Sequence, residues 1–491
     1  MSSPDGFCLG RLRFIRLPPT VLFLQRGAAK RPQSLTVELA VGITDDYGTD
    51  LAFDSVELKL EALDADSLEP LREVQLQLEG FPQSPSRSPH ASARFAFSPV
   101  QGPVLKLTTT LTFPPTFPAR SMPTSLVFSL SAVPHPSEQP ASDAPDPLQG
   151  SPSTSWIRET IREPTQVPLT LWDDRQAVLL GVRSGPVKIA LADGPTRIAS
   201  EKVQTAVRTI QLPAKQPLDS SAKGRPTTPA VQGGGQFAVI ERPGLNNSTG
   251  QRLWDCAIGL SAFLAEFPDA LDPQTSLATL SAEDGGERPR KRKRGDAKRT
   301  GSLRVVELGA GCGLASMAAA HALSTQGDRC ASVLATDIEA TVDSTLRENF
   351  VANGRLADAS AERKRRDVSP EPRIKVESAV LDWGELSATQ LDLVLGRRGA
   401  SRATTSSEES DNDLTILATD VLYNTDSHSI FLSTLLSLLR PPTTQSSYRR
   451  ALIAYKRRTD GDDEFFALAS EAGLDVGKIW EWGEVSVWSL V

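Results

Sequence analysis

The chain has 491 residues and a formal net charge of −7 at pH 7, with 53 lysine and arginine residues against 60 aspartate and glutamate residues. That length accommodates two or three domains. The acidic balance argues against a general nucleic-acid binder, because such proteins need a basic excess to neutralise phosphates. The four cysteines form no Cys-x-x-Cys pair and the four histidines are scattered, so we expect reduced thiols and no metal site. No apolar run reaches the length of about 18 residues that a membrane span requires, so we expect no membrane segment.

The first 155 residues predict a β-rich extension that is also rich in proline and serine. Alternating or strand-like apolar patterns occur at residues 35–41, 56–62, 104–108 and 125–130. Segments rich in proline and serine, such as residues 134–152, separate these strands and are typical of turns or linkers.

Residues 166–245 predict accessory strands that precede a larger domain. The first three, at residues 167–172, 177–182 and 187–191, are expected to form a small antiparallel set. A segment rich in glycine and proline follows, and residues 236–240 then predict one more short strand.

From residue 249 to residue 491, strands and helices alternate. Strands are predicted at residues 304–308, 332–336, 374–381, 414–419 and 451–456, and helices at 253–264, 314–323, 340–353, 429–439 and 463–472. Residues 478–482 and 485–490 predict a terminal hairpin. We therefore expect an α/β fold, a Rossmann-like, mostly parallel sheet with helices on both faces and an antiparallel hairpin at its edge.

Three loops interrupt this domain. The loop 285–300 carries a basic block at residues 288–299, which is typical either of a solvated loop or of a nuclear-import signal. We therefore expect a cytoplasmic protein, a nuclear one, or both. Insertions are predicted at residues 359–373 and 397–413.

A glycine-rich turn joins the first strand of this domain to its first helix and predicts a nucleotide-like ligand. It reads Glu307-Leu308-Gly309-Ala310-Gly311-Cys312-Gly313. No lysine follows Gly313, which excludes a phosphate-binding NTPase loop. The G-x-G-x-G spacing also differs from the G-x-G-x-x-G of dinucleotide folds.

Two acids at strand ends narrow the choice of ligand. Asp337 ends the second strand, where its carboxylate can accept hydrogen bonds from both hydroxyls of a ribose, as NAD and S-adenosylmethionine both require. Glu307 favours S-adenosylmethionine, because a carboxylate there attracts a positively charged sulfonium or amino group and repels a pyrophosphate.

Five motifs in order resemble the family-16 seven-strand methyltransferases. This group of protein-lysine methyltransferases includes the enzymes acting on valosin-containing protein, Hsp70 chaperones and elongation factors. The resemblance covers residues 249–491, roughly half of the chain. It rests on Leu253-Trp254-Asp255, the glycine turn with Glu307, Asp337 with Leu346-Arg347-Glu348-Asn349-Phe350-Val351-Ala352-Asn353, Leu381-Asp382-Trp383-Gly384, and Asp420-Val421-Leu422-Tyr423.

The resemblance implies S-adenosylmethionine as cofactor and gives each motif a role. Trp254 would pack over the methionine end, and Glu307 with the turn residues Gly309, Ala310, Gly311 and Gly313 would line the cofactor. Asp337 would hold the ribose, Trp383 would flank the adenine, and Thr419 would touch the cofactor from the fourth strand. Asp420 and Tyr423 would face the target amine as the catalytic pair, Asp420 aiming an incoming ammonium and Tyr423 forming an aromatic wall. Residues 456–458 are expected either to shape the substrate entrance or to be solvated, and no role is expected for His428.

The resemblance therefore implies transfer of methyl groups to a lysine of a protein substrate, with no membrane partner. Three alternatives stay open. They are an NAD(P)-linked oxidoreductase, a catalytically silent binding module, and a methyltransferase acting on histidine, nucleic acid or a small molecule. The sequence does not predict the substrate protein, the degree of methylation or the oligomeric state.

Overall fold

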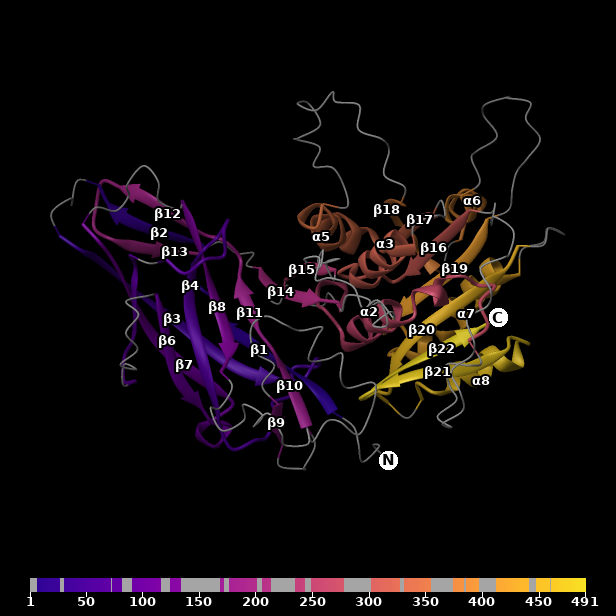
Figure 1. The fold of residues 1–491 in the computed structure, drawn as a ribbon, viewed down its shortest axis with the longest axis horizontal. Helices are drawn as coiled ribbons and strands as arrows, with labels where there is room; N and C mark the ends of the chain where they lie inside the picture. Colours follow the sequence, from indigo (N-terminus) through magenta and orange to yellow (C-terminus); the bar gives the residue numbers. More distant parts are fainter. Residues whose placement is uncertain are drawn as a thin grey trace, which may run out of the picture. The chain divides into compact units, whose positions relative to one another are not determined.

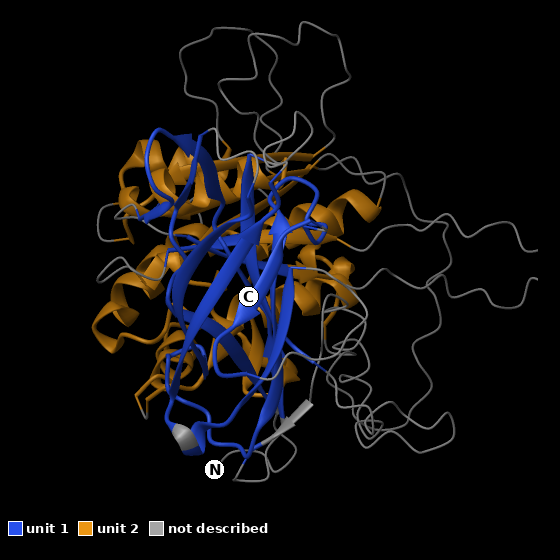
Figure 2. Cartoon of the chain, turned by 90° about the vertical axis from the view of Figure 1, so that its left-hand side faces the viewer, with its two compact units in different colours: residues 1–209, 239–247 blue, residues 210–238, 248–491 orange. Residues whose placement is uncertain are grey.

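The computed structural model describes residues 7–26, 31–71, 73–81, 91–115, 124–133, 168–171, 176–200, 205–212, 235–242, 249–277, 302–326, 331–354, 374–383, 386–396, 412–440, 447–459 and 461–491. The basic loop 285–300, the insertion 359–373 and residues 397–411 lie outside this part of the chain. The chain divides into two compact units, residues 1–209 with 239–247 and residues 210–238 with 248–491 (Figure 2). None of the helices described here is both long and apolar enough to cross a membrane.

The first unit is built from two sheets (Figure 1). One sheet has the order β5 (Gln75–Leu78), β7 (Val104–Phe113), β3 (Gln33–Thr44), β1 (Phe7–Arg16), β10 (Gln176–Leu180) and β9 (Pro168–Thr170). The other has the order β13 (Arg197–Ala199), β2 (Val21–Gln25), β12 (Val187–Ala192), β8 (Ser125–Ala132), β11 (Val182–Ser184), β14 (Ala206–Gln211) and β15 (Gln236–Glu241), with β4 (Val56–Asp64) paired to β8 and β6 (Ser92–Phe97) paired to β4. β14 and β15 each contain residues of both units.

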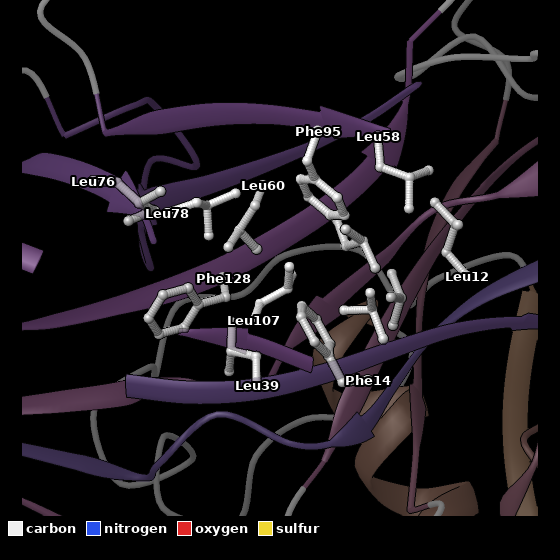
Figure 3. Packing of buried hydrophobic residues seen from close by; sticks show 14 of the residues in the cluster. Leu12, Phe14, Leu39, Leu58, Leu60, Leu76, Leu78, Phe95, Leu107 and Phe128 are labelled. Carbon is white, nitrogen blue, oxygen red and sulfur yellow. The ribbon is translucent and has the colours of Figure 1, made fainter. Parts of the chain in front are cut away.

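The inner faces of these two sheets form one apolar core. Along β4 buried and half-buried residues alternate, because successive side chains of a strand point to opposite faces. Figure 3 shows Leu58 and Leu60 of β4 and Phe95 of β6 on one side of this core, and Leu39 of β3 and Leu107 of β7 on the other. The predicted β-rich character of the first 155 residues is confirmed.

The small antiparallel set expected between residues 166 and 191 is only partly formed. β9 and β10 pair antiparallel, as expected, but β12 lies in the other sheet, parallel to β2 and antiparallel to β8. β10 also pairs in parallel with β1, so strands from before residue 155 and after residue 166 share both sheets. Local alternation predicts a strand but says nothing about a partner that lies more than 150 positions away, which is why these parallel pairings were not predicted.

The second unit contains a seven-stranded sheet. Its order is β18 (Ile374–Val380), β17 (Ala331–Asp337), β16 (Leu303–Leu308), β19 (Asp413–Thr419), β20 (Arg449–Lys456), β22 (Val485–Leu490) and β21 (Val476–Trp482). The first five strands run parallel, and β22 is antiparallel to both of its neighbours. The predicted α/β fold with a terminal hairpin is confirmed.

Helices cover both faces of this sheet. α6 (Ala388–Leu395), α7 (His428–Leu439) and α8 (Glu464–Glu471) pack over one face, where Phe431 and Phe465 lie against the strands. α2 (Asp255–Glu266) and α3 (Leu314–Gln326) pack against each other and against strands of the sheet. The predicted helix 340–353 is a continuous helical run made of α4 (Glu339–Thr341), a π-helical turn (Val342–Leu346) and α5 (Arg347–Ala352). α6 was not predicted. Short 3-10 turns occupy Pro99–Gln101, Thr249–Gln251, Pro268–Leu271 and Thr425–Ser427.

The central strands of the sheet explain why the site lies where it does. Every residue of β16, β19 and β20 is buried, as expected for parallel strands covered on both faces. Parallel strands end at one common edge, and ligands of open α/β sheets bind outside those carboxyl ends. The ends of β16, β17, β19 and β20 therefore bring the predicted motifs together.

Candidate active site

The glycine turn follows β16 and bends beside the end of β17. Gly309, Gly311 and Gly313 have φ angles of 69°, 54° and 78°, a left-handed region that side chains disfavour. The N–H of Ala310 donates to the carbonyl of Thr336 at 2.9 Å, which ties the turn to β17. The sequence-predicted turn residues therefore form one backbone cradle.

Space around the turn requires glycine as well. A Cβ added at Gly309 would lie 3.0 Å from Val421 Cγ1 and 3.2 Å from Trp383 Cζ2. At Gly313 a Cβ would lie 2.5 Å from Leu346 Cδ1 and 2.8 Å from Phe350 Cε1. These contacts place Trp383 and Val421 directly beside the turn.

Asp337 ends β17 and faces the glycine turn. Its Oδ2 accepts the N–H of Gly311 at 2.8 Å, and its Oδ1 accepts the N–H of Ile338 at 2.8 Å. Burial raises the pKa of this carboxyl, and the two backbone N–H groups act in the opposite direction. Each carboxylate oxygen has a second lone pair, so Asp337 retains the capacity to accept ribose hydroxyls.

Glu307 is fully buried and serves α3 directly. Its Oε2 accepts the backbone N–H of Ser316 at 2.9 Å and also the Ser316 hydroxyl. Its Oε1 has no hydrogen-bond partner among the described residues. Burial, with a smaller contribution from the nearby charge of Asp337, raises the pKa of Glu307 to about 7 despite the two bonds from Ser316. Glu307 thus caps the first turn of α3 with one carboxylate oxygen.

The motif at residues 346–353 holds the turn from the side. The Nδ2 of the buried Asn349 donates to the carbonyl of Cys312 at 3.0 Å. Asn353 Nδ2 donates to the carbonyl of Ala238 at 2.8 Å, and Asn353 Oδ1 accepts the N–H of Ala238 at 2.9 Å. The Asn349 amide therefore holds the glycine turn, and the Asn353 amide holds β15.

Aromatic and apolar residues flank the same edge of the sheet. Trp383 is half-buried, with its ring 4.8 Å from that of Phe431, so it belongs partly to the core. Ile338, directly after Asp337, is 56% exposed. The sequence did not single out Ile338, whose exposed apolar side chain lies directly after the strand-end acid.

Trp254 belongs to a loop that lies over the glycine turn. Its indole N–H donates to the carbonyl of Thr249 at 2.8 Å, and a Cβ at Gly311 would lie 3.4 Å from the carbonyl oxygen of Gly250. The guanidinium of Arg458 lies over the Trp254 ring, 5.0 Å from its centroid. The structure therefore brings Trp254 to the same strand ends as the glycine turn.

Thr419, Asp420 and Tyr423 follow one another at the end of β19. Thr419 is buried, and Asp420 donates its N–H to the carbonyl of Ala454 on β20 at 3.1 Å. Asp420 has a φ of 56°, which is unusual for a residue other than glycine. Tyr423 is 49% exposed, and its hydroxyl lies 3.4 Å from the Thr249 hydroxyl.

Two residues near Asp420 were misjudged from the sequence. His428 is buried, and its Nε2 lies 2.9 Å from the carbonyl of Leu422, so it helps to hold the loop that follows Asp420. Lys456 is also buried and pairs with Asp255 at 3.0 Å and Glu484 at 2.9 Å, so it is not a solvated side chain. The role of Lys456 leaves no local sequence signal, because Asp255 and Glu484 come from other elements.

These residues fit S-adenosylmethionine. The turn offers bare backbone, Asp337 lies at the strand end where a ribose is held, and the buried Glu307 Oε1 has no hydrogen-bond partner among the described residues. Together with the sheet order, in which a hairpin strand lies antiparallel at the edge, they fit the class of S-adenosylmethionine-dependent methyltransferases.

Comparison with known proteins points to the same class. The model of the lysine methyltransferase family matches residues 238–397 and 401–472. No curated protein sequence matches.

Solved structures show only distant similarity. The citrinin polyketide synthase CMeT domain is 14% identical over 39% of this chain and 46% of its own, with a TM-score of 0.23. The DszA carbon methyltransferase is 14% identical over 48% and 53%, with a TM-score of 0.25. TrmK of M. capricolum, in complex with S-adenosyl-homocysteine, is 10% identical over 38% and 62%, with a TM-score of 0.20. The chain thus spans about half the length of the first two structures.

Proposed function

We propose that this protein transfers methyl groups from S-adenosylmethionine to the side-chain amine of a lysine in a protein substrate. The name of the matching family supports lysine as the target. The observation that carries the proposal is the end of β19, where Asp420 has a left-handed backbone and the exposed ring of Tyr423 follows. Left-handed residues other than glycine are uncommon, although aspartate is one of those that adopt this conformation, and such conformations are concentrated at functional sites.

The cofactor contacts follow from the geometry described above. We assign the ribose hydroxyls to Asp337, the adenine to the surface of Ile338 and Trp383, and the methionine end to Trp254 and the backbone from Gly309 to Gly313. Glu307 Oε1 would attract the positive charge of the cofactor through the buried interior, where charges interact more strongly than in water. Thr419 would contact the cofactor from the end of β19.

The reaction needs a neutral amine. When bound, S-adenosylmethionine supplies a methyl group on a positively charged sulfur, and the sulfur keeps the bonding electrons as the amine nitrogen takes the methyl. A lysine with a pKa of about 10.4 costs about 4.6 kcal/mol to deprotonate at pH 7. Holding the amine in line is worth several kcal/mol more, so positioning by Asp420 and Tyr423 is their main contribution.

Labelling of native proteins tests this proposal. The wild-type chain, Asp420→Ala and the control Glu471→Ala are each incubated with cell lysate and S-adenosylmethionine labelled in the methyl group. Glu471 is an exposed acid at the far end of α8, so its removal should leave labelling unchanged. We expect labelled bands with the wild type and the control, and loss of label with Asp420→Ala while S-adenosylhomocysteine still binds. Equal labelling by Asp420→Ala would contradict the role of Asp420.

A further inference from the structure

The acid assigned to the acceptor amine is already paired with a cation from the neighbouring strand. Arg458 follows β20 and donates two hydrogen bonds to the Asp420 carboxylate, from Nε to Oδ1 at 2.7 Å and from Nη2 to Oδ2. The two side chains are only 4% and 7% exposed. Such a two-pronged contact fixes both groups, and arginine stays charged at every pH at which proteins fold.

The loop after β20 holds Arg458 in this position. The backbone N–H of Arg458 donates to Asp462 Oδ2 at 2.8 Å, and the N–H of Thr459 donates to the same oxygen at 3.0 Å. Trp254 covers the guanidinium from the other side. The arrangement is therefore built by three separate segments of the chain and is not a chance surface contact.

Other charged side chains surround this pair. Lys456 lies between Asp255 and Glu484, and Arg457 pairs with Asp463 at 3.5 Å. Asp462 accepts the N–H groups of the loop. Arg458 is therefore the cation that directly contacts Asp420, and the charges of these two side chains sum to zero.

We propose that Arg458 is a positioning residue that acts through Asp420 and makes the acceptor site select the neutral form of the amine. This inference rests on the proposed function, because it takes Asp420 to face the acceptor. An unpaired carboxylate would stabilise the ammonium and so oppose the loss of its proton. With Arg458 in place, an ammonium meets a guanidinium as well as a carboxylate, and the proton goes to water before the nitrogen reacts.

An analogue with a built-in amine tests this without any knowledge of the substrate. Sinefungin carries an amino group on carbon in place of the methylsulfonium of S-adenosylmethionine, and S-adenosylhomocysteine carries neither. The ratio of their dissociation constants, measured by calorimetry, isolates the field at the amine from general effects on cofactor binding or folding. The variants are Arg458→Met, which removes the cation, Asp420→Asn, which removes the anion, and Arg458→Lys, which restores a cation.

The proposal predicts shifts of opposite sign. At pH 7, Arg458→Met should strengthen the binding of sinefungin about tenfold relative to that of S-adenosylhomocysteine, as expected for one unbalanced charge near an ammonium. Asp420→Asn should weaken the relative binding of sinefungin, and Arg458→Lys should give the same ratio of dissociation constants as the wild type. Raising the pH from 7 to 9 should strengthen the binding of sinefungin to the wild type but not to Arg458→Met.

An unchanged ratio in both Arg458→Met and Asp420→Asn would overturn the proposal, and so would identical pH profiles for Arg458→Met and the wild type. If Arg458→Met does not bind S-adenosylhomocysteine, the same ratio of dissociation constants is compared in Asp420→Asn and Arg458→Lys. An unchanged ratio in Asp420→Asn would then overturn the proposal. Failure of the labelling experiment would leave these ratios unaffected, so the two proposals fail separately.

Discussion

Replacing Glu307 by glutamine should stabilise the cofactor-free protein at neutral and alkaline pH. Glu307 is buried, no cation among the described residues lowers its pKa, and its pKa rises from 4.5 to about 7 in the folded protein. The folded state therefore binds this proton more tightly than the unfolded chain does. The contribution of Glu307 to the free energy of unfolding is fully present below pH 4.5 and is lost as the pH rises through 7.

The magnitude follows from the two pKa values. Each pKa unit corresponds to about 1.36 kcal/mol, so the wild type loses about 3 kcal/mol between pH 4.5 and pH 8 through this group alone. Glutamine cannot ionise but keeps an oxygen for Ser316. The stability of Glu307→Gln relative to the wild type should therefore increase by about 3 kcal/mol over this range and level off above pH 7.

Urea unfolding of both proteins without cofactor, at several pH values from 4.5 to 8.5, measures this difference. Glu471→Gln changes an exposed acid, so its plot of unfolding free energy against pH should run parallel to that of the wild type throughout. Parallel curves for Glu307→Gln and the wild type would show that the carboxyl titrates normally and would refute the reasoning.

Two further substitutions test the cradle. Asp337→Asn should weaken binding of S-adenosylhomocysteine about tenfold to a hundredfold, because hydrogen bonds to a charged acceptor contribute about 1.5–3 kcal/mol; an unchanged dissociation constant by calorimetry would remove Asp337 from the ribose site. Gly313→Ala should destabilise the second unit by about 2–5 kcal/mol, since the added Cβ would meet Leu346 and Phe350 in a left-handed backbone. Gly354 has a φ of 63°, and none of the described atoms lies within 4 Å of a Cβ added there, so Gly354→Ala should reduce the free energy of unfolding by only about 1 kcal/mol. Equal unfolding midpoints for Gly313→Ala and Gly354→Ala would contradict the packing argument.

The seven-stranded fold could be predicted because its signals are local. Apolar runs, the spacing of the three glycines and the hairpin residues each report on a few neighbouring positions, and all pointed to the same sheet. The residues of the glycine turn, Asp337 and Asp420 were found for the same reason. α6 was missed although Ser387 and Gln390 form a capping box and Gly396 ends the helix in a left-handed conformation, which is a readable signal.

What the sequence could not predict depends on partners from distant segments. The pairing of β1 with β10 joins residues far apart in the chain, and no local pattern specifies it. The same holds for the contact of Arg458 with Asp420. This contact changes the expected chemistry, since Asp420 is not an isolated carboxylate awaiting an ammonium.

The central claim is tested most directly by identifying the amino acid that receives the methyl group. Proteins labelled by the wild-type chain are digested completely, and the labelled amino acids are separated and identified by mass spectrometry. The account predicts label in Nε-methylated lysine, absent from the Asp420→Ala sample. Label in methylhistidine, in nucleic acid or in a small molecule would contradict it.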